Sequence, residues 1–105
     1  MVDTRQHQQP LQHALDAAEH AILLAQEAER KLQAAMTQAD PQAIASAQAE
    51  LGHAKRQVAD ANSQLDAYNK EPYAQQIKQT LEQLHQAAQD LDVNQAKSTT
   101  PKQIR

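Results

Sequence analysis

The apolar residues between positions 40 and 69 recur at alternating steps of three and four, and this spacing constrains the fold more than any other feature. It places them on one stripe of an α-helix, as in the seam of a coiled coil. The preceding Asp40-Pro41 pair favours a helix start, because aspartate caps the first turn and proline is tolerated in it. The sequence therefore predicts a long central helix that packs against other helices. Its stripe consists of Ile44, Ala47, Leu51, Ala54, Val58, Ala61, Leu65 and Tyr68.

Stripes of the same spacing lie on both sides of this segment. The first helix is expected to begin just before Pro10, since proline fits the first turn of a helix better than its interior. It should end near Ala39, because the residue before Pro41 avoids the α conformation. The first stripe contains Leu11, Leu15, Ala18, Ile22, Ala25, Glu29, Leu32 and Met36, with Ala14, Ala21, Ala28 and Ala35 beside it. A second break at Asn69 to Pro72 precedes the third stripe, which contains Ala74, Ile77, Leu81, Leu84, Ala88 and Leu91.

Short links between helices make consecutive helices antiparallel neighbours. The sequence therefore predicts an all-α fold, an antiparallel up-down-up three-helix bundle of the coiled-coil type. The polar segments at both ends carry no apolar period and are expected to be flexible tails. The predicted boundaries are helices at about 9–39, 41–69 and 72–92, one domain over 9–92, and tails at 1–8 and 93–105.

The predicted bundle leaves one end of the first two helices uncovered. Aligning the turns places Glu29 level with Leu51 and Leu91, where the third helix is expected to end. Beyond this layer, either the C-terminal tail or another molecule should cover the apolar residues. Two leucines, at 23 and 24, form a second apolar strip off the main seam. The candidate partner-binding residues are Leu32, Met36, Ile44, Leu23 and Leu24.

Glu29 is an unusual residue for a seam position, because a buried carboxylate is costly without a partner. Its side chain is expected to reach solvent as the bundle narrows. Pairing with Lys55 or Arg56, or a place at an interface, are the alternatives.

Two Glu-x-x-His motifs, Glu50–His53 and Glu82–His85, have the spacing of ligand pairs in ferritin-like di-iron bundles, where every ligand projects into the core. The heptad positions instead direct both motifs outward or to the flanks of their helices, and the chain offers no fourth helix. We therefore expect no metal site and no cofactor. A metal-binding bundle that uses these surface His and Glu residues is the alternative function.

The 105-residue chain has a formal charge of −3, and 40% of its residues are hydrophobic. The acidic excess argues against nucleic-acid binding, which relies on a basic surface. The sequence contains no run of about 18 apolar residues, so no membrane span is predicted. The N-terminus lacks the apolar centre of a signal peptide. Without cysteine or a glycine-rich phosphate loop, neither thiol catalysis nor nucleotide binding has support. A cytoplasmic, non-enzymatic protein is expected.

The spacing of the stripes resembles that of spectrin-like and other short coiled-coil bundles, and the Ala- and Gln-rich composition is similar to that of small bacterial helical proteins. This likeness includes no motif that names a family. The expected function is a protein–protein interaction or scaffold module that acts through coiled-coil-type contacts. The partner would be another protein or a second copy of the chain, as in a homodimer.

Overall fold

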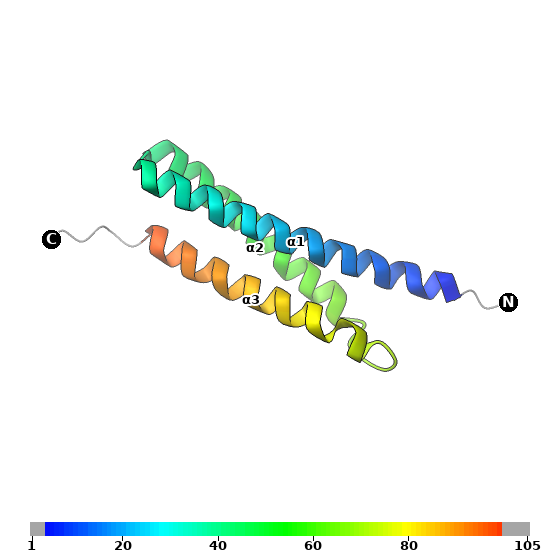
Figure 1. Ribbon diagram of the computed structural model, residues 1–105. Helices are drawn as coiled ribbons and strands as arrows, with labels where there is room; N and C mark the ends of the chain where they lie inside the picture. Colours follow the sequence, from blue (N-terminus) through cyan, green and yellow to red (C-terminus); the bar gives the residue numbers. More distant parts are fainter. Residues whose placement is uncertain (1–3, 100–105) are drawn as a thin grey trace.

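The computed structural model describes the backbone of residues 4–99 and the side chains of residues 10–98. This part of the chain consists of three helices and contains no strand: α1 (Thr4–Gln38), α2 (Pro41–Asp66) and α3 (Ala74–Thr99). Figure 1 shows α1 and α3 running in one direction and α2 in the other, and every helix packs against the other two. The predicted up-down-up three-helix bundle is confirmed.

The turn between α1 and α2 satisfies the backbone at both helix ends. The amide of Ala39 donates to the carbonyl of Met36 at 3.1 Å, and that of Asp40 donates to Ala35 at 3.4 Å. This pair of bonds is the Schellman motif that ends many helices, and it holds Ala39 at a left-handed φ of 56°. The Asp40 carboxylate then accepts from the amides of Gln42 and Ala43, the first turn of α2. The predicted aspartate cap is confirmed.

The second connection is longer than predicted, because α2 ends at Asp66 and α3 begins at Ala74. The amides of Tyr73 and Ala74 both donate to the carbonyl of Lys70, at 2.7 and 3.0 Å. The rings of Tyr68 and Tyr73 meet edge to face with their centroids 6.4 Å apart. The two tyrosines therefore join the end of α2 to the start of α3, as their positions beside the break indicate.

The predicted start of the first helix near residue 9 is wrong, since α1 begins at Thr4 and contains Pro10 in its interior. A proline removes the hydrogen bond of its own nitrogen to the carbonyl four residues earlier, but it leaves the neighbouring bonds of the helix possible. The predicted flexible segment 1–8 therefore overlaps with helix from Thr4 onward, while residues 1–3 lie outside the described residues.

The predicted end of the third helix at residue 92 is also wrong, because α3 continues to Thr99. The buried stripe of α3 continues past Leu91 with the polar residues Asn94, Gln95 and Ser98, all partly buried. Their side chains form hydrogen bonds to α1 and α2, so the helix keeps packing after its apolar pattern stops. The rest of the predicted C-terminal tail, residues 100–105, lies outside the described part of the chain.

The core contains the predicted seam of α2 but a different stripe of α1. On α2, six seam residues from Ala47 to Leu65 are buried. On α1, the buried residues are Leu11, Ala14, Ala18, Ala21, Ala25, Ala28, Leu32 and Ala35. Four residues that the predicted seam of α1 contained are only partly buried, namely Leu15, Ile22, Glu29 and Met36. The alanine flank occupies the centre of the interface because small side chains permit two neighbouring helices to approach α1 closely.

Candidate interaction surfaces

The large apolar side chains of α1 lie beside its core stripe and keep part of their surface exposed. Leu15 and Ile22 are partly buried against the core, and so is Leu24. Leu23 has 63% of its surface exposed. Because alanines supply most of the central contact, Leu15 and Ile22 form an apolar margin on the flank of α1 that faces α3. Leu24 lies on the opposite flank, and Leu23 lies on the outer face of the helix. The predicted strip at Leu23 and Leu24 is thus one exposed leucine next to a half-buried one.

At the tip formed by α1 and α2, the candidate residues have unequal exposure. Leu32 is only 1% exposed and offers almost no surface to a partner. Met36 and Ile44 are partly buried against the core. Leu32 is covered within the chain, in which α3 is two turns longer than the apolar pattern indicates. The sequence left open whether the C-terminal tail or another molecule covers this end, and the structure buries Leu32 within the chain.

The longer α3 is held to both neighbours by polar contacts. The side-chain amide of Gln48 on α2 donates to the carbonyl of Ser98 at 3.2 Å and to its hydroxyl at 3.1 Å. On α1, the Gln33 amide donates to the side-chain oxygen of Asn94 at 3.4 Å. Lys55 of α2 donates to the side-chain oxygen of Gln95 at 2.9 Å. These contacts hold the last turns of α3 against α1 and α2.

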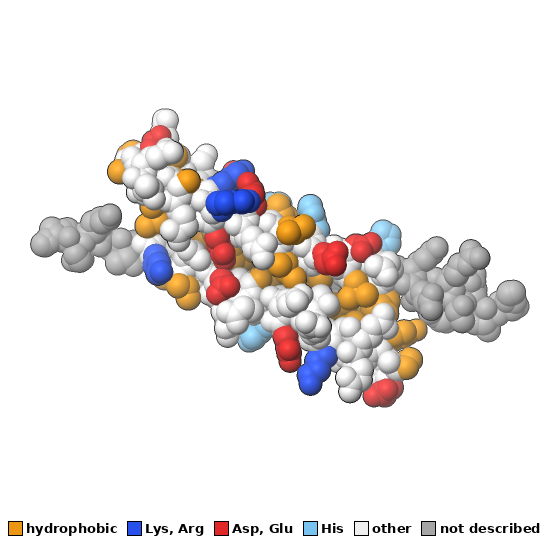
Figure 2. All heavy atoms as spheres, in the orientation of Figure 1, with side chains coloured by type: hydrophobic (Ala, Val, Ile, Leu, Met, Phe, Trp, Pro, Cys, Tyr) orange, Lys and Arg blue, Asp and Glu red, His pale blue; other side chains and the backbone are white. Residues whose placement is uncertain are grey.

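A groove runs between α1 and α3. Ala25 and Ala87 are buried in it, and Ile22 is partly buried beside them. The remaining lining residues are polar, and two of them are acidic. In Figure 2, hydrophobic side chains lie between α1 and α3 with Asp and Glu side chains beside them. The complete lining is Ile22, Ala25, Gln26, Glu29, Gln83, Gln86, Ala87 and Asp90.

Glu29 faces Asp90 across this groove, and not a cation. The pKa of Glu29 is raised above its ordinary value, first because burial removes water from the carboxylate and second because Asp90 adds a negative charge nearby. The proposed pairing with Lys55 is absent, since Lys55 forms an ion pair with Asp92 at 2.9 Å. Among the three ion pairs of the described side chains, none includes Glu29, Asp90 or Arg56.

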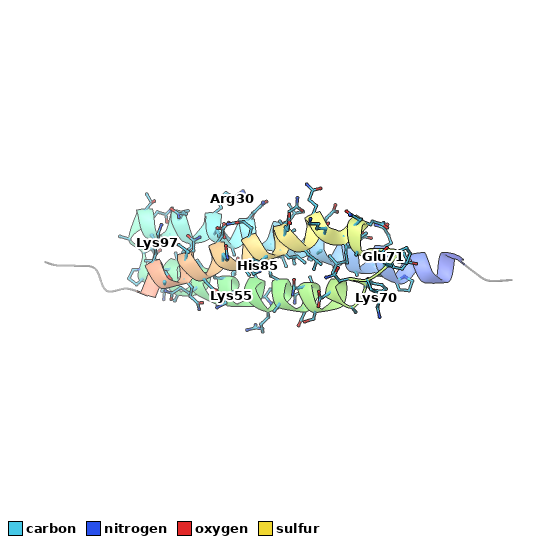
Figure 3. All side chains as sticks on the ribbon, turned by 90° about the horizontal axis from the view of Figure 1, so that it is seen from below. Arg30, Lys55, Lys70, Glu71, His85 and Lys97 are labelled. Atoms are coloured by element: carbon cyan, nitrogen blue, oxygen red, sulfur yellow. The ribbon has the colours of Figure 1, made fainter. Side chains whose placement is uncertain are left out.

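A second groove lies between α2 and α3. Lys55 and Val58 line it from α2, and Leu84, His85 and Asp92 line it from α3. Figure 3 shows the labelled side chains of Lys55 and His85 on these two helices. Unlike the α1–α3 groove, this groove contains a cation already paired with an acid of the opposite helix.

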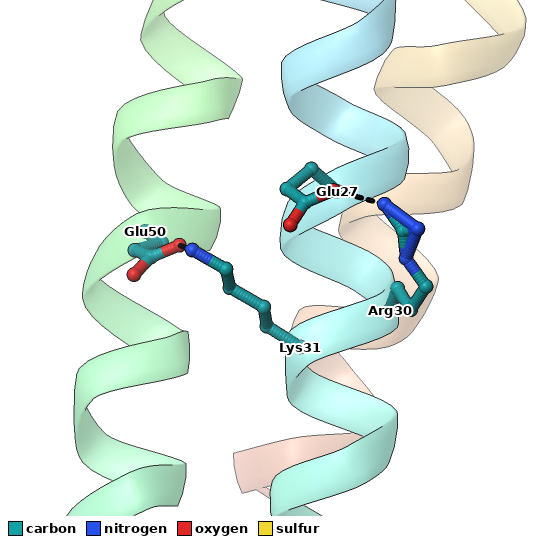
Figure 4. A network of polar contacts seen from close by, with 4 residues as sticks. All are labelled: Glu27, Arg30, Lys31 and Glu50. Atoms are coloured by element: carbon teal, nitrogen blue, oxygen red, sulfur yellow. Dashed lines mark hydrogen bonds and ion pairs between the residues drawn. The ribbon is translucent and has the colours of Figure 1, made fainter.

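The two Glu-x-x-His motifs lie in different places. Glu50 lines a groove between α1 and α2. It forms an ion pair with Lys31 at 3.1 Å, as Figure 4 shows. Glu82 and His85 line the side of the bundle between α2 and α3, and His53 is exposed. Within the described residues, no three His, Cys, Asp or Glu side chains gather closely enough to hold a metal ion. The structure does not bring the two motifs together.

The sequence patterns did not predict two features of these surfaces: the acidic neighbour of Glu29 and the contact between Gln48 and Ser98. The closeness of Asp90 to Glu29 could have been predicted, because the layer alignment puts Glu29 level with Leu91 and the residue before Leu91 is Asp90. The contact between Gln48 and Ser98 had no such signal, since the apolar period that locates a helix stops at Leu91.

Comparison with known proteins identified no relative of this chain. No family model matches the chain, and neither the curated proteins nor the solved structures gave a match. In the described residues, no helix is both long enough and apolar enough to cross a membrane.

Proposed function

We propose that this chain is a non-enzymatic interaction or scaffold module that binds another protein, or a second copy of itself, through coiled-coil-type contacts. The observation that supports this proposal is the apolar margin of α1. Its alanines fill the core, while Leu15 and Ile22 remain half-buried and Leu23 is mostly exposed. A helix that places its larger apolar residues beside the core can bury them against an added helix.

Covering the exposed parts of these side chains would contribute to association. Burying apolar surface stabilises a contact by about 25 cal/mol for each Å², so a fully buried leucine contributes roughly 1.5–3 kcal/mol. Two or three such residues, in a helix-in-groove contact, are anchors of the kind that dominate small interfaces. Met36 and Ile44, which are partly buried at the tip formed by α1 and α2, provide a second apolar surface.

The test is the Leu23→Glu variant in sedimentation and capture experiments with the full chain. Because Leu23 is exposed, the variant should keep the helical content of the parent protein and weaken self-association or partner capture by at least about tenfold, or roughly 1.4 kcal/mol. The matched control is Ala49→Glu, which adds the same charge at an exposed position of α2 and should leave association unchanged.

Two results contradict the proposal. One is a monomer that captures no protein in either form. The other is equal weakening by Leu23→Glu and Ala49→Glu, which would indicate a general charge effect and no defined surface.

A further inference from the structure

We propose that the α1–α3 groove binds an amphipathic helix of another protein that carries Lys or Arg residues beside its apolar stripe. This inference rests on the proposed interaction function and names the chemistry of the partner. It follows from the combination of an apolar floor with two carboxylates that have no counter-charge.

The floor of the groove is small, because Ala25 and Ala87 are almost fully buried and Ile22 is the only large apolar residue among the described residues that line it. Ala25 and Ala87 lie at its base, and their short side chains leave a shallow hollow between the two helices. Ile22 supplies a larger apolar wall on α1. Side-chain amides of Gln26 and Gln83 border the floor and can donate to or accept from an arriving side chain.

The charge of the groove is one-sided. Its two ionisable residues, Glu29 and Asp90, are both acidic, and none of the lining residues is basic. The cations near Glu29 in the sequence are engaged elsewhere: Arg30 pairs with Glu27, as Figure 4 shows, and Lys31 pairs with Glu50. Two carboxylates that repel each other at a helix interface weaken the free protein, and an ammonium or guanidinium group placed between them would remove this repulsion.

The same charges favour a different protein over a second copy of this chain. The chain carries a net charge of −3, so two copies repel each other at neutral pH. A basic helix meets complementary charge in the groove and is attracted to the whole molecule. This complementarity increases the association rate and selects among apolar helices of similar shape.

The test measures binding of the full chain to a fluorescein-labelled helical peptide of roughly 20 residues, long enough to span about 30 Å. This probe has Leu and Ala on one stripe and Lys on both flanks, and a second probe replaces every Lys by Glu. The expected result is binding of the lysine probe, measured by fluorescence anisotropy, and none of the glutamate probe. Affinity should fall when the pH is lowered through the raised pKa of Glu29, since protonation removes the charge that the lysine contacts.

The deciding variant is the double substitution Glu29→Gln with Asp90→Asn, which should weaken binding of the lysine probe at least about fivefold. Removing the repelling charges should not destabilise the bundle, so lost binding would not reflect unfolding. The control, Asp60→Asn with Glu71→Gln, changes the net charge equally at exposed positions outside the groove and should leave the affinity unchanged.

Equal weakening by both double variants would overturn the proposal, because it would show binding to the overall charge and not to the groove. Failure of the lysine probe to bind, or equal binding of both probes, would overturn it as well. None of these outcomes affects the Leu23→Glu test. The proposed interaction function is therefore tested separately from the proposed basic partner helix.

Discussion

At the scale of single residues, Glu29 shows how a neighbouring helix sets the behaviour of one side chain. Its heptad position directs it to the interface, and the α1–α3 groove places Asp90 opposite it. Burial and the second carboxylate both favour the protonated form of Glu29 and raise its pKa. The folded chain therefore holds this proton to a higher pH than the unfolded chain does.

Linkage gives the sign of the effect on stability. A group with a raised pKa in the folded state stabilises that state at low pH and loses this contribution as the pH rises through the raised value. The Glu29→Gln variant should thus be more stable than the parent at pH 7, by less than about 1 kcal/mol because the carboxylate is partly exposed. Near pH 4, close to the ordinary pKa of a glutamate, the difference should vanish.

Thermal unfolding followed by circular dichroism at both pH values measures this difference. Glu71→Gln, in the exposed turn before α3, is the control and should show no such pH dependence. A Glu29→Gln effect of the same size at both pH values would contradict the assigned repulsion.

At the scale of elements, α3 is the helix whose extent depends most on tertiary contacts. Its apolar stripe of Ile77, Leu84 and Leu91 is buried as the sequence indicates. Its last two turns are polar, and they pack because Asn94 and Ser98 find hydrogen-bonding partners on the other helices. The three-four spacing of the sequence reports apolar packing only, so this pattern stops at Leu91 while α3 continues to Thr99.

Deletion of residues 93–105 tests this extension. The shortened chain keeps the Lys55–Asp92 ion pair but loses the hydrogen bonds of three side chains to α3, so unfolding by urea should become easier by roughly 1–3 kcal/mol. The lost bonds are those of Gln33 to Asn94, Gln48 to Ser98 and Lys55 to Gln95. Hydrogen exchange should accelerate around Leu32. Deletion of residues 100–105 alone leaves these three contacts in place and is the control. Full stability of the shorter chain would show that the last turns of α3 contribute nothing.

At the scale of the whole molecule, the bundle is built on close approach at an alanine stripe. Ala18 and Ala25 of α1 have at most 1% of their surface exposed, whereas Leu15 and Ile22 lie at the sides. Short side chains at the centre let three helices meet with little space between them, and the larger residues fill the margins. This arrangement also leaves the apolar margin on which the interaction proposal rests.

The Ala18→Leu variant tests the central position of this stripe. Three added carbon atoms at a fully buried site should destabilise the fold by roughly 1–3 kcal/mol, measured by urea denaturation. Ala34→Leu adds the same atoms at an exposed position of α1 and should have little effect. Equal stability of the two variants would place the centre of the interface elsewhere.

The sequence alone determined the number of helices, their order and the two breaks, because the three-four spacing and the prolines act locally. It also determined the seam of α2, whose flanks are too polar to compete. On α1 three adjacent heptad positions are almost wholly apolar, so the pattern left its orientation open. Only packing against two neighbours at once decided that the alanines face inward, and only the arrangement of α1 beside α3 brought Glu29 to Asp90.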